Sequence, residues 1–176
     1  AKTVLLERYG HLGGMATGGL VNIIPNLADI EGRQWIGGFC QEFITRMKNR
    51  GAADFPPQSA WGRPDPALVE KYARASMGHF YLRQNRNDER VVLYTAVIDP
   101  EVGKDELNRM AEEAGVELLL HTWVTAPIVE NGCVRGVIAE SKAGRQAILG
   151  KVVIDSTGDG DLLMNVPTET VDYMRP

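Results

Sequence analysis

Apolar and polar residues follow several different periods in the first half of the chain. Residues 3–6 read TVLL, a continuous apolar run that is typical of a strand buried on both faces of a parallel sheet. Over residues 35–50 the apolar positions recur at helical spacing, and Gly51 stands where a helix ends in the left-handed conformation. A second helix is predicted from Asp65, with Pro66 at its first position. Its apolar face consists of Leu68, Val69, Tyr72, Ala73 and Met77.

The pattern in the middle of the chain predicts a strand, a helix and a second strand. Residues 91–95 form the first apolar run, and DPEVGKDELNRMAEEAG follows it. This stretch marks both helix ends, because Asp99 is a good N-cap and Gly115 a good terminator. The apolar run VELLLH comes next. This order of elements is typical of an α/β protein.

After residue 123 the pattern becomes that of antiparallel strands. Three segments, 124–130, 133–141 and 146–149, are predicted to form a meander. They are joined at Asn131-Gly132, a strong hairpin signal, and at residues 142–145. The stretch KVVIDSTGDGD then predicts a last buried strand over residues 151–155, which ends in acidic residues and glycines.

Composition narrows the class of protein. The 176 residues, 44% of them hydrophobic, are enough for a globular core. A net charge of -4 without any Lys/Arg run argues against a nucleic-acid partner. No apolar run approaches the roughly 20 residues of a membrane helix. The two cysteines, Cys40 and Cys133, have neither disulfide-framework nor zinc-site spacing, which fits a reducing compartment. We expect a cytoplasmic protein that binds neither nucleic acid nor membrane.

The end of the first predicted strand carries candidate chemistry. Glu7 follows TVLL directly, and a carboxylate at such a strand end can hold ribose hydroxyls while disfavouring a 2′-phosphate. The positive charge of the neighbouring Arg8 weakens this discrimination against a 2′-phosphate. The glycines of GHLGGMATGGL come next and let the main chain approach a ligand closely. The alternative is that Glu7 and Arg8 form an ordinary solvated strand end.

The stretch DSTGDGD is the second candidate site, and it has two interpretations. Four of its residues match the first half of a calcium-binding EF-hand loop: Asp155, Thr157, Asp159 and Gly160. The twelfth position, however, is Val166 rather than a bidentate glutamate, which leaves calcium as the minor alternative. In a nucleotide loop, Gly158 and Gly160 would let backbone amides approach an anion or sugar, and Asp159 would bind a hydroxyl.

Three stretches together resemble the FAD-dependent oxidoreductases of the glutathione-reductase-like superfamily, in the branch with a TGDGD motif. They are LLERYGHLGGMATGGLVN, DPEVGKDELNRMAEEAGVELLLHTWVT and VVIDSTGDGD. The resemblance implies an α/β fold, namely a partial, three-layer Rossmann-like FAD/NAD(P)-binding domain with a three-stranded antiparallel meander and a helical cap insertion. Residues 1–24 and 96–166 would form the FAD-binding domain, and residues 25–95 the substrate-facing cap. FAD is the implied cofactor and a small molecule the implied substrate.

The resemblance also implies which residues contact FAD. Glu7 would bind the adenosine ribose, the glycine segment would run along the cofactor toward the flavin, and the backbone near Val124 would touch adenine. The TGDGD loop would contact the pyrophosphate and the ribityl chain. The expected cofactor-binding residues are Glu7, Arg8, Gly13, Gly14, Met15, Ala16, Thr17, Gly18, Gly19, Val124, Thr157, Gly158 and Asp159. No catalytic residue is implied.

For the substrate side, residue type alone suggests His79, Tyr81 and Arg83, because they combine titratable and anion-binding side chains in one short run. A histidine among aromatic residues is more often a packing or surface residue, so we favour that role for this run.

The chain also departs from the family pattern. The family begins with a strand and a G-x-G-x-x-G turn and continues well beyond TGDGD, and neither part occurs in this sequence. We therefore expect a chain truncated at both ends, with weakened FAD binding and with exposed sheet edges through which an oligomer could form.

Three functional hypotheses remain open. The first is an FAD-dependent oxidoreductase, or a fragment of one, that transfers hydride between a small molecule and flavin. The second is a non-catalytic remnant with the same core, which binds no flavin and serves at most as an interaction module. The third, a Rossmann-like domain that uses NAD or a nucleoside, leaves the TGDGD loop and the meander without a purpose.

Overall fold

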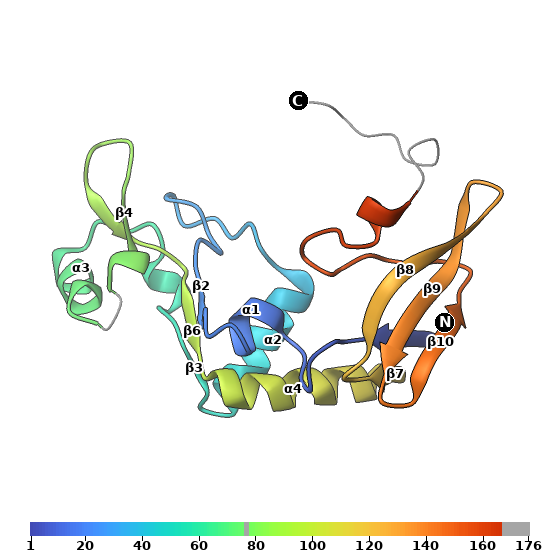
Figure 1. The fold of residues 1–176 in the computed structure, drawn as a ribbon. Helices are drawn as coiled ribbons and strands as arrows, with labels where there is room; N and C mark the ends of the chain where they lie inside the picture. The colour runs from blue at the N-terminus through green and yellow to red at the C-terminus, as the bar shows by residue number, and fades with distance from the viewer. Residues whose placement is uncertain (76–77, 167–176) are drawn as a thin grey trace. The chain divides into compact units, whose positions relative to one another are not determined.

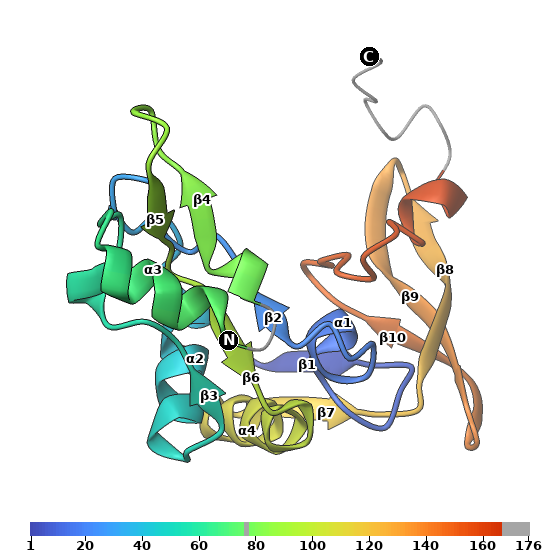
Figure 2. The same ribbon diagram turned by 90° about the vertical axis from the view of Figure 1, so that its left-hand side faces the viewer.

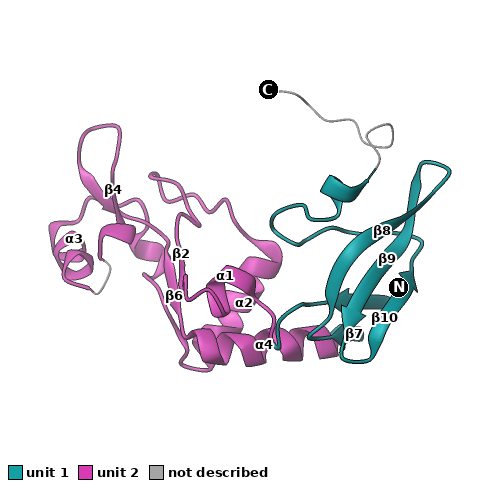
Figure 3. Ribbon diagram, viewed as in Figure 1, with its two compact units in different colours: residues 1–10, 114–176 teal, residues 11–113 magenta. Residues whose placement is uncertain are grey.

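The computed structural model describes residues 1–75 and 78–166, which form two compact units (Figures 1 and 3). Unit 1 consists of residues 1–10 and the chain from Ala114 onward, and unit 2 of His11–Glu113. The predicted division into an FAD-binding domain and a cap concerns function, and it stays a prediction. Met77, expected on the apolar face of a helix, lies outside the described residues.

Unit 1 contains the parallel pair that the first apolar run predicted. Strand β1 (Thr3–Leu6) pairs in parallel with β7 (Val116–Leu119), and Thr3 lies opposite Val116. The pairing continues one residue further, because the Glu7 amide donates to the Leu119 carbonyl at 3.0 Å. Within the described ranges β7 is the only ladder partner of β1, so the other edge of β1 is open. This explains why β1 is only half-buried.

The predicted meander is confirmed in unit 1 as a three-stranded antiparallel sheet. Its strands are β8 (Trp123–Glu130), β9 (Cys133–Ser141) and β10 (Gly144–Leu149). Asn131 and Gly132 connect β8 to β9 with φ angles of 51° and 71°. A type I′ turn requires positive φ at both central residues, and this dipeptide tolerates it.

The buried strand predicted over residues 151–155 is wrong. No strand is assigned there, and Val152 and Ile154 are 78% and 80% exposed. An apolar run becomes a buried strand only when neighbouring strands satisfy its main-chain groups, and no described strand pairs with this segment. The short 3₁₀ helix η3 (Leu163–Asn165) ends the described part of unit 1.

In unit 2, the first predicted helix is confirmed as α2 (Gly38–Asn49), which begins later than the periodicity suggested. Phe43, Ile44 and Met47 form its buried face. Three apolar side chains before or in its first turn are instead exposed: Trp35 (71%), Ile36 (45%) and Phe39 (63%). Gly51 has a φ of 68°, as expected for the left-handed end of a helix.

The second predicted helix is confirmed as α3 (Pro66–Ala73). The Asp65 carboxylate accepts hydrogen bonds from the amides of Ala67 and Leu68 at 2.9 and 3.2 Å, so it caps the helix as expected. Figure 2 shows α3 alongside the hairpin of β4 (Leu82–Gln84) and β5 (Arg90–Val92). A small core joins them, which contains Ala60, Tyr72, Tyr81, Leu82 and Val92.

The main core of unit 2 lies around a three-stranded antiparallel sheet in which β6 (Ala96–Ile98) is central. Its neighbours are β2 (Ile23–Ile24) and β3 (Ala53–Asp54). Of the strand predicted over residues 91–95, only Val91 and Val92 lie in a strand, β5, and residues 93–95, which include Tyr94, connect β5 to β6. The Tyr94 ring stacks on Trp61 at 4.1 Å with an interplanar angle of 8°, and Tyr94 is fully buried.

The predicted helix in the middle of the chain is confirmed as α4 (Pro100–Glu113). Asp99 accepts from the amides of Glu101 and Val102, and Gly115 has a φ of 67°. Two 3₁₀ helices, η1 (Gln58–Ala60) and η2 (Gly78–Phe80), complete unit 2 apart from the glycine segment. None of the helices in the described part of the chain is both long and apolar enough to cross a membrane.

Candidate functional site

Glu7 is held firmly at the carboxyl end of β1. Its main-chain carbonyl accepts from the Thr122 amide at 2.9 Å, and its carboxylate Oε1 accepts from the Tyr9 amide at 2.8 Å. Within the described part of the chain, Oε2 has no hydrogen-bond partner. One carboxylate oxygen therefore orients the side chain, and the other remains available to hydroxyl groups of a ligand.

Arg8 lies against aromatic side chains of unit 1. Its guanidinium carbon is 4.7 Å from the centre of the Tyr9 ring and 5.8 Å from that of Trp123, and Nη2 donates to the Tyr9 hydroxyl at 2.9 Å. Val124 follows Trp123 at the start of β8. The structure thus brings the predicted residues Glu7, Arg8 and Val124 into one region of unit 1.

The TGDGD loop, also in unit 1, is organised around the carboxylate of Asp155. Oδ1 accepts from the Thr157 amide at 3.0 Å and from its hydroxyl at 2.7 Å, and Oδ2 accepts from the Leu162 amide at 3.1 Å. Partial burial alone would raise the pKa of Asp155, but these hydrogen bonds favour the charged form and hold the pKa below its ordinary value. The Thr157 hydroxyl in turn accepts from the Asp161 amide at 3.0 Å.

The tip of this loop is open. Gly158 and Gly160 have φ angles of 89° and 71°, and a Cβ built on Gly158 would meet no atom within 4 Å. Asp159 between them is exposed. Both oxygens of Asp155 accept hydrogen bonds from N–H or O–H donors of the loop. In the two described ranges, no group of three or more His, Cys, Asp and Glu side chains is arranged to hold a metal ion.

We expect Asp155→Ala to release the TGDGD loop, because three donors lose their acceptor. Amide hydrogen exchange at Thr157 and Leu162 should then become faster by about tenfold or more, in proportion to the lost local stability. Since the folded pKa of Asp155 is lowered, its contribution is fully present above the ordinary carboxyl pKa of about 4 and is lost as the pH falls through the lower folded pKa. Asp159→Ala is the control, and equal exchange in both variants would contradict the prediction.

Residues 11–20 of the glycine segment belong to unit 2, where they form a tight turn into α1 (Gly14–Thr17). Thr17 is fully buried, and its hydroxyl donates to the Leu12 carbonyl at 2.7 Å. Its side chain therefore has a structural role, and any contact of Thr17 with a ligand would have to come from the main chain. Ala16 packs against the main core, whereas the Met15 side chain is 66% exposed.

Close packing accounts for several of the glycines. A Cβ on Gly18 would overlap the imidazole of His11, and one on Gly19 would lie 2.9 Å from the Cα of Met15. Gly14, in contrast, would meet nothing within 4 Å. The compact turn thus explains Gly18 and Gly19 without a ligand, and the contact of residues 13–19 with FAD stays a prediction.

The substrate-side candidates have different surroundings. Tyr81 is 3% exposed and packs on Tyr72 with ring centres 5.3 Å apart, and burial raises the pKa of Tyr81. The packing role that the sequence analysis favoured is therefore confirmed for Tyr81. The His79 ring lies on Phe80 at 4.2 Å. Arg83 is exposed, and its Nη1 donates to the carbonyls of His79 and Leu82 at 3.0 and 2.8 Å.

A surface hollow of about 420 Å³ in unit 2 was not predicted; we call it the Arg83 hollow. It is lined by Asn26, Ala28, Asp29, Ile30, Trp35, Arg83, Gln84 and Leu93. Sequence reasoning missed it because the lining comes from two separate segments, residues 26–35 and 83–93. The only local signal was the spacing of Asp29 and Arg33, which can form an ion pair.

Asp29 organises one side of the Arg83 hollow. Its Oδ2 accepts from the Trp35 indole Nε1 at 2.9 Å and from the Arg33 Nε at 2.8 Å, and its Oδ1 accepts from the amides of Glu31 and Arg33. The hydrogen bond from Trp35 is the largest cause that lowers the pKa of Asp29 to about 2; burial opposes it, and the hydrogen bonds and charge of Arg33 add to the lowering. Asp29 is therefore ionised at neutral pH, with its charge balanced by Arg33.

The groups exposed in unit 1 fit an adenine dinucleotide. A carboxylate oxygen is available at the end of a parallel strand, and a loop with two left-handed glycines has free space at Gly158 where a side chain would otherwise stand. Hydroxyl-rich and anionic groups are the parts of FAD that such donors and acceptors recognise.

The comparison with protein families decides the assignment. The model of the family described as FAD dependent oxidoreductase matches residues 1–170. The chain belongs to this family. FAD is accordingly its cofactor, the resemblance noted from the sequence is confirmed, and the mixed α/β architecture is consistent with a partial FAD/NAD(P)-binding domain. A comparison with curated protein sequences gave no significant match.

Solved structures show distant similarity. THI4 from Thermovibrio ammonificans has 12% identity and a TM-score of 0.44, with 93% of this chain and 51% of that chain covered. NikD, described as an unusual amino acid oxidase essential for nikkomycin biosynthesis, has 13% identity and a TM-score of 0.35, with 83% and 43% covered. L-Amino acid deaminase from Proteus myxofaciens has 18% identity and a TM-score of 0.29, with 60% and 21% covered. The chain thus spans about half the length of the first of these structures.

Proposed function

We propose that this chain carries part of the FAD-binding surface of an oxidoreductase that transfers hydride between a small-molecule substrate and flavin. The single observation that carries the proposal is the family match over residues 1–170. The available oxygen of Glu7 and the open TGDGD loop support it, because both present the groups that a dinucleotide requires.

In this proposal Glu7 accepts hydrogen bonds from the adenosine ribose, and the backbone near Val124 contacts adenine. Thr157, Gly158 and Asp159 contact the pyrophosphate and ribityl chain. The main chain of residues 13–19 runs along the cofactor. FAD, when bound, supplies the hydride acceptor or donor. The protein residues orient it, exclude water and balance its charge.

We also propose a cytoplasmic location.

A second candidate function has two observations in its favour. The open edge of β1 and the exposed side chains of Val152 and Ile154 are features through which chains pair with one another. A chain that binds no flavin could use them as an interaction module. In that case we expect the molecular mass in solution to rise with protein concentration.

The test of the proposed function is an FAD titration of the purified full chain, followed by desalting and a visible absorbance spectrum. Retained flavin in stoichiometric amount supports the proposal. A folded circular dichroism spectrum without retained flavin overturns it for this chain and favours the interaction module.

We expect Glu7→Gln to weaken FAD binding by about tenfold, or about 1.4 kcal/mol, because the charged acceptor of the ribose hydroxyls is lost while the shape is kept. The dissociation constant can be measured from the quenching of flavin fluorescence. Glu117→Gln is the matched control, since Glu117 is an exposed carboxylate on β7 of the same unit. The same dissociation constant for Glu7→Gln and the wild type would contradict the predicted role of Glu7.

A further inference from the structure

We infer that the Arg83 hollow binds a small organic carboxylate, with Arg83 as the anion-binding group and the Trp35 indole as the wall against which the ligand body rests. The hollow lies entirely within unit 2, so the inference depends on no contact between the units. Its volume of about 420 Å³ is that of a site for one small molecule.

Arg83 is prepared to bind an anion. Nη1 donates to the carbonyls of His79 and Leu82, which fixes the guanidinium without neutralising it. No carboxylate of the described residues forms an ion pair with Arg83, and its Nε and Nη2 make no hydrogen bond with them. A guanidinium with two unused donor groups suits a carboxylate, which it can bind through two parallel hydrogen bonds.

Trp35 provides an aromatic surface that is oriented although it is exposed. Its ring is 71% exposed, whereas its Nε1 donates to Asp29 at 2.9 Å. Asp29 receives four hydrogen bonds and is paired with Arg33 at 2.8 Å, so its negative charge is already compensated. Asp29 therefore positions the indole, and its repulsion of an incoming anion is weakened by Arg33.

The floor of the hollow is apolar. It is formed by Ala28 and Leu93, which are only 3% and 2% exposed and therefore belong to the packed interior. Gln84 donates from Nε2 to Asp88 at 2.8 Å, and its amide oxygen faces no described donor. Arg90, opposite Gln84 in the β4–β5 register, adds a second cation close to Arg83.

This combination favours a carboxylate on an apolar or flat body over inorganic phosphate. Phosphate is bound by clusters of N–H donors. Among the described residues, Arg83 is the one guanidinium that lines this hollow, next to an indole and an apolar floor, and Arg90 lies near it outside the lining. Stacking of the ligand body on the Trp35 ring and burial of its apolar area would add to the binding free energy that the ionic contact supplies. The inference goes beyond the proposed function. Binding of the carboxylate does not depend on the proposed function. Only the further step, in which flavin oxidises this same molecule, would rest on it.

The test uses the flavin-free full chain and two probes, benzoate and its neutral analogue benzamide. Binding is followed by the NMR shift of the Trp35 indole N–H, which is a direct report from the hollow. We expect benzoate to shift this signal with a dissociation constant of about 1 mM, and benzamide to bind about tenfold more weakly. Arg83→Gln should weaken benzoate binding about tenfold.

Arg63→Gln is the matched control, because Arg63 is another exposed arginine of unit 2 that forms no ion pair with a described residue and does not line the hollow. It should leave benzoate binding unchanged. No shift of the Trp35 signal up to about 10 mM benzoate, equal affinities for benzoate and benzamide, or equally tight binding of inorganic phosphate would each overturn the inference. The comparison of the two probes needs only the wild type, so it decides the matter even if Arg83→Gln fails to fold. Flavin takes no part, so a failed FAD titration leaves this result intact.

Discussion

Replacing Gly13 by alanine is expected to destabilise unit 2 by about 4 kcal/mol, the larger of the two stability effects that the structure predicts. Gly13 has a φ of 105°, which is unfavourable for any residue with a Cβ. The added Cβ would also lie 2.5 Å from the Oγ1 and Cγ2 atoms of Thr17 and 2.8 Å from a methyl carbon of Leu107.

This overlap cannot be relieved by a small movement, because Thr17 is fully buried and donates to the Leu12 carbonyl at 2.7 Å. A shift of Thr17 would break a buried hydrogen bond as well as the packing of α1 on α4. The near-ultraviolet circular dichroism of the stacked pair Trp61 and Tyr94 reports on unit 2 and can be followed in a urea titration.

Gly14→Ala provides the control for Gly13. Gly14 also has a positive φ, 49°, but a Cβ there would meet nothing within 4 Å. The Gly14→Ala substitution should therefore lower the free energy of unfolding only by the backbone strain, about 1 kcal/mol. Similar urea midpoints for the two variants would contradict the role that we assign to the Gly13–Thr17 contact.

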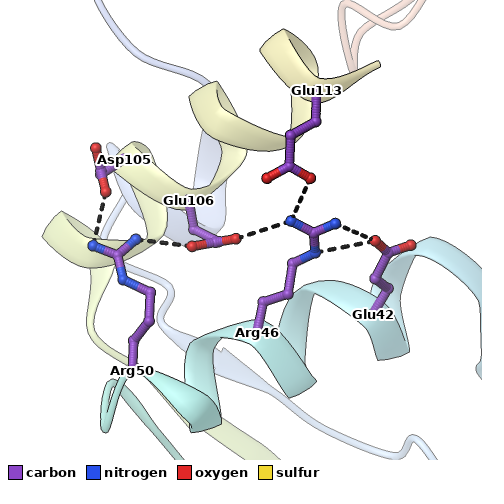
Figure 4. A network of polar contacts seen from close by, with 6 residues as sticks. All are labelled: Glu42, Arg46, Arg50, Asp105, Glu106 and Glu113. Atoms are coloured by element: carbon purple, nitrogen blue, oxygen red, sulfur yellow. Dashed lines mark hydrogen bonds and ion pairs between the residues drawn. The ribbon is translucent and has the colours of Figure 1, made fainter.

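The second large effect concerns Glu106, a buried carboxylate between α2 and α4 (Figure 4). Glu106 is 4% exposed. Its Oε2 is paired with the Arg50 Nη1 at 2.9 Å, and its Oε1 lies 3.5 Å from the Arg46 Nη1. The hydrogen bonds that Arg46 donates to Glu113 and then to Glu42 raise the pKa of Arg46 above its ordinary value, so Arg46 stays charged.

We expect Glu106→Ala to lower the free energy of unfolding of unit 2 by about 3 kcal/mol. The substitution leaves two guanidinium groups without their shared buried acceptor and creates a cavity between the helices. This loss of stability should be smaller than the loss on breaking an isolated buried ion pair, because Arg50 remains paired with Asp105, and Arg46 with Glu42 and Glu113. The urea midpoint measured by the Trp61–Tyr94 signal checks this value.

Glu113→Ala is the matched control for Glu106, since Glu113 also pairs with Arg46, at 2.7 Å, but its side chain is 51% exposed. Its removal should cost at most about 1 kcal/mol, as for other surface ion pairs. If both variants lost the same stability, burial would not be the reason for the importance of Glu106.

Local signals predicted the helices well because their causes lie within a few residues. Asp65 and Asp99 cap α3 and α4 through their own carboxylates, and Gly51 and Gly115 take up left-handed conformations after α2 and α4. The turn at Asn131-Gly132 is local in the same way. Propensity and capping are properties of short segments, so the sequence suffices to predict them.

Predictions that required a distant partner succeeded only where the partner was present. The run TVLL pairs with β7, but the equally apolar run at Val152 and Ile154 has no strand beside it among the described residues and stays exposed. The exposure of Trp35 and Phe39 was missed for a related reason. Periodicity identifies an apolar face, but it does not say what covers that face.

The sequence by itself determined the capped starts of α3 and α4, the hairpin turn at Asn131-Gly132, the acidic residue after β1 and the TGDGD stretch. Only the tertiary structure decided that the Thr17 side chain faces the interior, that Glu106 is buried between two arginines, and that Trp35 and Arg83 line one hollow. The physical reason is the range of the interactions. Caps and turns are formed by neighbours in the chain, whereas burial and the meeting of residues 26–35 with 83–93 depend on how distant segments pack.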